Sequence, residues 1–184
     1  MIRALSLALL LAVSPAWAAD EPAKPAKPTL AFPRIASAGG VVALPDGVDM
    51  PASDAVHRLL IDATGAETTA SGINRHLEAA ARAVNLYALA GVVPENVKVA
   101  VVVHGKATPL VLSAAAYQRH FGKPSADAAL VAALHDAGVA IYVCGQSLIH
   151  SGHAVTDVHE DVTVALSAMT KLVELQAAGY GLIP

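Results

Sequence analysis

The fold is decided by VKVAVVVHG, residues 97–105. Its first seven residues are nearly all valine and alanine, which indicates a strand that is buried on both faces of a sheet. Short apolar runs at 56–62 and 139–143 predict two more strands. Residues 162–164 predict a brief strand, and 180–183 predict a last strand at the sheet edge.

Helical patterns separate these strands. Between Ser71, the expected N-cap, and Gly91, the expected end, apolar residues recur at the spacing of one helical face. They are Ile73, Leu77, Ala80, Val84 and Tyr87. Further helices are predicted at 113–120, 124–138, 145–151 and 166–178, the last with Leu166, Met169 and Val173 on one face. Strands that alternate with helices favour an α/β fold with a mostly parallel sheet and helices on both faces.

Composition excludes several classes of protein. A net charge of −3 gives no basic excess for binding nucleic acid. The chain is 55% hydrophobic and only 15% charged, which is too apolar for a disordered protein. Its single cysteine, Cys144, cannot form a disulfide within the chain.

The N-terminus has the pattern of a signal peptide over residues 1–18. Arg3 precedes an apolar stretch, and Ala16 and Ala18 fit an A-x-A cleavage site. We expect a periplasmic protein without membrane attachment after cleavage; the alternative is a retained anchor. Residues 19–54 are rich in proline and are expected to form a linker and an arm, followed by one domain over 55–184.

Chemically capable side chains stand where two strands end, at His104-Gly105 and at Cys144-Gly145-Gln146. Sites in parallel sheets lie beyond the carboxyl ends of the strands. A thiol at a strand-to-helix junction lies near the positive end of the helix, which lowers its pKa. His104 could pair with the thiolate or move protons, and Gln146 could donate a hydrogen bond to a ligand. The alternatives are a buried, inert Cys144 and a structural, hydrogen-bonded His104.

A second group of histidines follows the short helix. His150, His153 and His159 lie near Glu160 and Asp161. Because an H-x-x-H spacing in a loop is a weak metal signal, these are interpreted as solvated loop histidines. The sequence predicts neither a metal site nor a cofactor.

Several strings in the chain resemble the DsrE/DsrF-like family, and in particular its exported branch. They are NLY at 85–87, KVAVVVHG at 98–105, AY at 116–117, IYVCGQS at 141–147, ALSAMT at 165–170 and GYGLIP at 179–184. The resemblance covers roughly residues 41–184. It implies a three-layer α/β sandwich with five or six strands, in homo-oligomers that are commonly trimers or hexamers. In sulfur-relay members a cysteine after a strand carries a persulfide between partner proteins, and Cys144 matches that place by element order.

The favoured hypothesis is that the protein handles sulfane sulfur through a persulfide on Cys144, as a sulfurtransferase or a sulfur carrier. The expected partners are further copies of the chain and a protein that donates or accepts sulfur. His104 is expected to assist Cys144, and four residues are expected to bind the substrate: Gly105, Gly145, Gln146 and Asn85. The alternatives are a non-catalytic oligomeric module that binds a small molecule or a metal, and a structural protein.

Overall fold

Five parallel strands form the central sheet in the computed structural model, which describes residues 27–183. Their order is β6-β5-β4-β3-β7. The strands are β3 (His57–Ala63), β4 (Val97–Val103), β5 (Ala140–Cys144), β6 (Thr163–Ala165) and β7 (Gly181–Ile183). Each predicted strand is confirmed to within one residue at either end, and β7 occupies the edge beside β3. The expected signal peptide lies outside the described residues.

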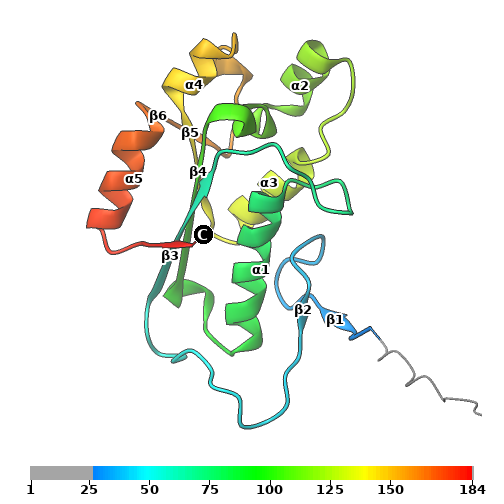
Figure 1. Ribbon diagram of the computed structural model, residues 1–184, viewed down its shortest axis with the longest axis vertical. Helices are drawn as coiled ribbons and strands as arrows, with labels where there is room; N and C mark the ends of the chain where they lie inside the picture. Colours follow the sequence, from blue (N-terminus) through cyan, green and yellow to red (C-terminus); the bar gives the residue numbers. More distant parts are fainter. Residues whose placement is uncertain (1–26, 184) are drawn as a thin grey trace, which may run out of the picture.

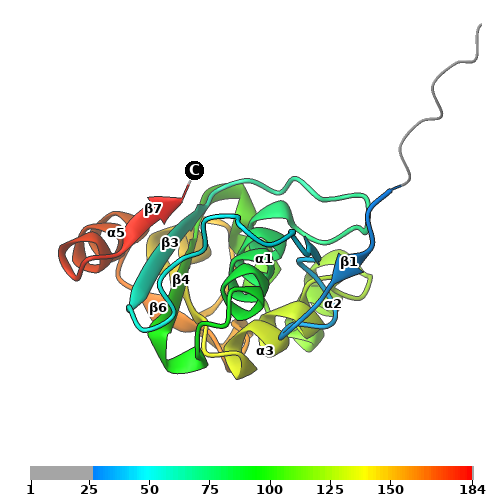
Figure 2. The ribbon, with the colours of Figure 1, turned by 90° about the horizontal axis from the view of Figure 1, so that it is seen from below.

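Helices cover both faces of the sheet, so the predicted α/β fold class is confirmed. Helices α1 (Arg75–Leu89) and α3 (Ala128–Asp136) pack on one face, and α5 (Ala168–Ala177) packs on the other (Figure 1). The three layers are also seen along the sheet in Figure 2. Side chains of β4 alternate between them: Val99, Val101 and Val103 join the core under α1 and α3, whereas Ala100 and Val102 join the core under α5. Burial on both sides explains the run of valine and alanine.

The start of α1 corrects one prediction. Asn74, not Ser71, caps this helix, and its side chain accepts a hydrogen bond from the backbone N–H of His76. The Asn74 amide also donates to the carbonyl oxygens of Gly65 and Glu67, which fixes the loop before the helix. Ile73 therefore lies just outside the helix that it was expected to begin.

Two shorter helices lie at the carboxyl end of the strands. Helix α2 (Ala114–Phe121) follows a 3₁₀ helix at Gly105–Val111, and α4 (Gly145–His150) continues directly from β5 (Figure 1). Another 3₁₀ helix, Val155–Asp157, lies against α2 and α4. These segments surround the carboxyl ends of the strands, where the candidate residues were predicted.

Helix α5 presents an apolar face to solvent. The buried side chains of this helix, Ala168 and Leu175, pack on the sheet. Met169 and Val173 lie on one face of α5, but that face points away from the sheet, with exposed fractions of 78% and 64%. Leu166, which was expected to lie in this helix, comes before its N-cap Ser167 and is 74% exposed. Within residues 27–183, no helix is long and apolar enough to cross a membrane.

The described part of the N-terminal arm lies against α1. It contains a small antiparallel pair, β1 (Leu30–Ala31) and β2 (Val41–Val42). Ile35 and Ala38, between the two strands, are buried in the core that α1 shares with the sheet. The arm thus adds apolar contacts to the face of α1 that the sheet leaves uncovered.

Candidate functional site

The carboxyl ends of three neighbouring strands bring Asp62, His104 and Cys144 to one edge of the sheet. Val103 of β4 is the register partner of Val143 of β5. His104 and Cys144 are the next residues along these two strands, so they lie at the same level of the sheet. His104 keeps an extended backbone, with φ −157° and ψ 179°. The alternation of side chains therefore places both residues on the α5 face, beside each other at the strand ends.

Cys144 is the N-cap of α4, and its sulfur is a hydrogen-bond acceptor. The backbone N–H of Ser147 donates to Cys144 Sγ at 3.4 Å. Cys144 is only 5% exposed. Burial raises the pKa of this thiol, but hydrogen bonds from the Ser147 hydroxyl and from three backbone N–H groups outweigh burial and leave the pKa below its ordinary value. The three N–H groups belong to Ser147, Ala168 and Gln146. The site therefore favours the thiolate more than an ordinary cysteine does.

Ser147 joins the thiol to the end of β4. Its Oγ accepts a hydrogen bond from the backbone N–H of Gly105 at 3.2 Å. Gly105 has a positive φ of 58°, which side chains other than glycine's rarely allow. Gly105 thus turns the chain from β4 into the 3₁₀ helix, and its N–H contacts Ser147 at this turn. Sequence reasoning gave Ser147 no role, although its position three residues after Cys144 is the spacing of a cap and its partner.

Gly145 and Gln146 lie at the site, where their contacts are with backbone atoms of neighbouring segments. A Cβ atom on Gly145 would stand 2.9 Å from the carbonyl oxygen of Ala165, so only glycine allows β6 to approach so closely. Gln146 Nε2 donates to the carbonyl oxygen of Leu166 at 3.4 Å, which ties α4 to the segment before α5. Both residues therefore help to hold the start of α5 beside the sulfur.

His104 has Asp62, not Cys144, as its hydrogen-bond partner. Its Nε2 lies 2.7 Å from Asp62 Oδ1, and both side chains are about one-third exposed. Because Asp62 belongs to β3 and Cys144 to β5, the imidazole reaches to the side away from the thiol. No hydrogen bond joins His104 to Cys144 among residues 27–183. The expectation that His104 pairs directly with the thiolate is not met in this arrangement.

Asn85 was expected to bind substrate, but the structure places it elsewhere. It is fully buried in α1, and its Oδ1 accepts from the backbone N–H groups of Arg34 and Ile35. Its Nδ2 donates to the carbonyl oxygens of Ile35, Ala38 and Gly39. Because the amide is fully used by the N-terminal arm, Asn85 holds that arm on α1 and has no free atom for a substrate.

An open groove, with a volume of about 530 Å³, adjoins the thiol site at Gly105 and Ser147. It is lined by Ala66, Gly105, Lys106, Pro109, Ser147, His150 and Ser151. Cys144 does not line this groove, but Ser147, which contacts the sulfur, does. Lys106 supplies a positive charge at the same place. A small anion in the groove would lie next to the groups that hold the thiol.

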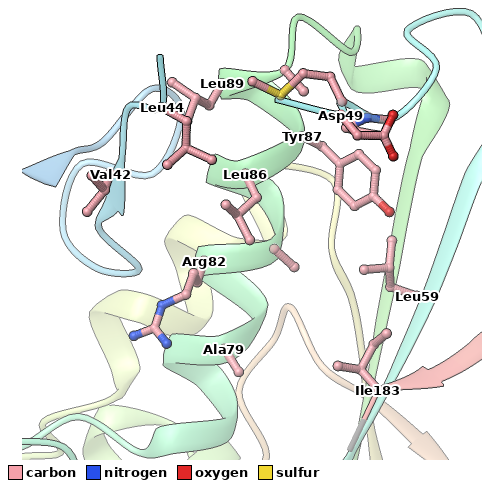
Figure 3. A pocket seen from close by; sticks show the side chains of 14 residues that line it. Val42, Leu44, Asp49, Leu59, Ala79, Arg82, Leu86, Tyr87, Leu89 and Ile183 are labelled. Carbon is pink, nitrogen blue, oxygen red and sulfur yellow. The ribbon is translucent and has the colours of Figure 1, made fainter. Parts of the chain in front are cut away.

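A second pocket, with a volume of about 570 Å³, lies between the arm and α1. Apolar side chains from three parts of the fold point into it (Figure 3). They are Leu44 of the arm, Leu86 and Tyr87 of α1, and Leu59 and Ile183 of the sheet. Its charged lining residues are Asp49 and Arg82. It belongs to the α1 face of the sheet, whereas Cys144 belongs to the α5 face. This apolar pocket is therefore separate from the thiol site.

His153 is not a solvated loop histidine, which corrects the prediction for that residue. It is 7% exposed, and its ring packs edge-on against His120 with 4.6 Å between the ring centroids. Burial lowers the pKa of His153, the neighbouring His120 lowers it further, and Asp157 offsets part of this shift, so the neutral ring is favoured. His159 instead lies beside Asp161, with 3.7 Å between Nδ1 and a carboxylate oxygen.

Comparisons with known proteins agree with this fold. The sequence model of the DsrE/DsrF-like family matches residues 58–184. Among solved structures, the protein of unknown function MTH1491 from Methanobacterium thermoautotrophicum is similar, with a TM-score of 0.52 and 21% sequence identity. That likeness covers 69% of this chain and 97% of MTH1491, and at this identity it supports the fold alone. A search of curated proteins found no match.

Proposed function

The chain belongs to the DsrE/DsrF-like family, and we propose that it handles sulfane sulfur through a persulfide on Cys144. The observation that carries this proposal is the set of N–H groups around the sulfur, from the starts of α4 and α5. Donors fixed in this way stabilise negative charge on sulfur in both the thiolate and the persulfide. A cysteine kept only as a small apolar side chain has no need of them.

The first half of the proposed reaction loads the cysteine. The Cys144 thiolate attacks the outer sulfur of a donor such as thiosulfate, and a Cys144 S–S bond forms. The S–S bond of thiosulfate breaks, and its electron pair leaves with sulfite. Lys106 in the adjoining groove favours the approach of such an anion. The product is a persulfide anion within reach of the same N–H groups.

The second half unloads the cysteine. A nucleophilic acceptor, such as cyanide or a thiolate, attacks the outer persulfide sulfur and takes it, and the Cys144 thiolate returns with its electron pair. Because Cys144 is 5% exposed, this site suits small donors and acceptors better than direct contact with another protein's cysteine. The His104–Asp62 pair, at the carboxyl ends of the neighbouring strands, would help to orient the acceptor.

The test is the formation of thiocyanate from thiosulfate or polysulfide with cyanide as acceptor. We expect thiocyanate to form catalytically, at a rate proportional to the protein concentration. A rate no higher than that of the donor and cyanide alone, with every sulfane donor, would argue against a sulfurtransferase. If the protein is instead a sulfur carrier that does not pass its sulfur to cyanide, the Cys144 persulfide is still detected in the intact mass of the protein.

Replacing Ser147 with alanine is expected to raise the pKa of the Cys144 thiol, because the hydroxyl hydrogen bond that favours the thiolate is lost. Less thiolate is then present at neutral pH, so the rate of alkylation by iodoacetamide falls about three- to tenfold and its pH midpoint moves upward. Ser151→Ala, at the other end of α4, is the control and should leave the profile unchanged. If Ser147→Ala leaves the pH dependence of the alkylation rate unchanged, Ser147 does not stabilise the thiolate.

A second candidate function is a non-catalytic module that binds a small apolar molecule, and the pocket between the arm and α1 favours it. Anilinonaphthalene sulfonate, an apolar fluorescent probe, would bind there, and Leu86→Asp would reduce its binding. Binding that is unaffected by Cys144→Ser, in a protein that forms no persulfide, would favour this second function over the first.

Self-association is part of the proposal, with a second copy of the chain covering the exposed side chains of Met169 and Val173 on α5 and of Leu166 just before it. Monomeric proteins rarely expose several apolar side chains of this size so near one another in the chain, and the family resemblance implies trimers or hexamers. We expect a multimer by light scattering, and a smaller mass for the double variant Met169→Glu and Val173→Glu. Val93→Glu, at an exposed apolar position after α1, is the control. A wild-type monomer at all concentrations would contradict the proposal.

We also propose a periplasmic location, which rests on the signal-peptide pattern of residues 1–18. The mature protein should be recovered from the periplasmic fraction, with an N-terminus close to residue 19. Recovery of the full-length chain from the cytoplasm would contradict it.

A further inference from the structure

Three side chains that commonly bind metals converge away from the thiol site. They are His120 at the end of α2, His153 after α4, and Asp157 in the 3₁₀ helix that follows. One ring nitrogen from each histidine and one carboxylate oxygen all lie within 4.8 Å of one another. His153 and Asp157 are near neighbours in the chain, whereas His120 is 37 residues from Asp157 and is brought to them by the fold.

His153 contributes a buried nitrogen without a partner. Its Nδ1 has no hydrogen-bond partner among residues 27–183, and the residue is 7% exposed. Buried polar atoms are nearly always paired, so an unpaired imidazole nitrogen calls for an explanation. Coordination to a metal ion between the three side chains would give the histidine ring a partner.

Asp157 is held in place by donors that a metal site would also use. Arg119 Nη2 donates to Oδ1 at 2.7 Å, and the backbone N–H of Ala154 donates to Oδ2 at 3.1 Å. His120 Nε2 lies 3.1 Å from the same Oδ2. Groups that orient a ligating carboxylate in this way are typical of the surroundings of metal sites.

We propose that His120, His153 and Asp157 form a binding site for a divalent transition metal ion of the zinc class. Two histidines and one carboxylate are a known ligand set for such ions, with nitrogen and oxygen donors rather than thiolate. Tetrahedral bonds of the usual length put ligand atoms about 3.3 Å apart, close to the present separation of His120 and Asp157. His120 is one-third exposed, so a fourth coordination position faces water.

The test is calorimetric titration of the intact, metal-free protein with Zn²⁺, after purification without a histidine tag. We expect one ion per chain, with affinity reduced more than about tenfold in His120→Ala and in Asp157→Asn. Because His120 is exposed, its replacement should leave the fold intact, which circular dichroism checks. His150→Ala and Cys144→Ser are matched controls and should bind Zn²⁺ like the wild type.

Co²⁺ gives a second readout of the ligand set. The wild type and Cys144→Ser should show the same visible d–d bands without a thiolate charge-transfer band, and His120→Ala should lose them. No Zn²⁺ binding by the wild type, unchanged binding by His120→Ala, or loss of binding in Cys144→Ser would each overturn the proposal. These outcomes are independent of the persulfide chemistry, because no residue is shared between the two sites.

Discussion

Replacing Cys144 with serine is expected to reduce sulfur transfer to the uncatalysed rate, a loss of at least about a thousandfold. Serine lacks the nucleophilic thiolate and cannot hold a sulfane sulfur as a persulfide. The change is close to isosteric, and a serine oxygen is itself a good N-cap for α4, so the fold should be kept. Transfer is measured as thiocyanate formation, and the thermal midpoint of unfolding is measured beside it.

The single cysteine makes this variant easy to interpret. Wild-type protein should be alkylated once by iodoacetamide, and Cys144→Ser not at all, because the chain has one Cys. Sulfur transfer that survives in a folded Cys144→Ser protein would contradict the proposed role of the thiol. Loss of transfer together with loss of folding would be resolved by Cys144→Ala, which removes the thiol and leaves a small apolar side chain.

Replacing Asn85 with alanine is expected to lower the free energy of unfolding by about 3–5 kcal/mol. Five hydrogen bonds between the buried amide and the backbone of Arg34, Ile35, Ala38 and Gly39 would be lost, two accepted by Oδ1 and three donated by Nδ2. The backbone groups left behind lie under the arm, and groups buried without partners cost more than the lost bonds alone. Urea denaturation measures the change.

Asn96→Ala is the control for this variant. Asn96 makes one exposed hydrogen bond, to the carbonyl oxygen of Ser53 at 3.4 Å, and its replacement should cost less than about 0.5 kcal/mol. Under conditions in which Asn85→Ala is folded, its rate of sulfur transfer should equal that of the wild type. A slower rate at unchanged stability would instead place Asn85 at the substrate site.

The fold could be predicted from the sequence because its strands carry their own signal. Val97–Val103 is apolar on both faces, and the helices between strands show clear periodicity or capping residues. The error at Ser71 arose because a loop of several polar residues offers more than one cap. Asn74 takes that role since its amide also binds two carbonyl oxygens of the loop.

The candidate site could be predicted only in part. The position of Cys144 follows from strand order, but its partners come from α4 and α5 and depend on how the helices pack. Asn85 looks like a site residue because it is polar within an apolar helix; its partners lie 46 to 51 residues away in the chain. The same limit applies to His120 and Asp157, which are 37 residues apart and in contact.

Whether Cys144 carries sulfane sulfur is measured by the intact mass of the protein after treatment with polysulfide or thiosulfate. We expect a gain of about 32 Da for one added sulfur atom, located on the peptide that contains Cys144 and removed by a reducing thiol. An unchanged mass with every donor, in protein whose Cys144 still reacts with iodoacetamide, would contradict the proposal.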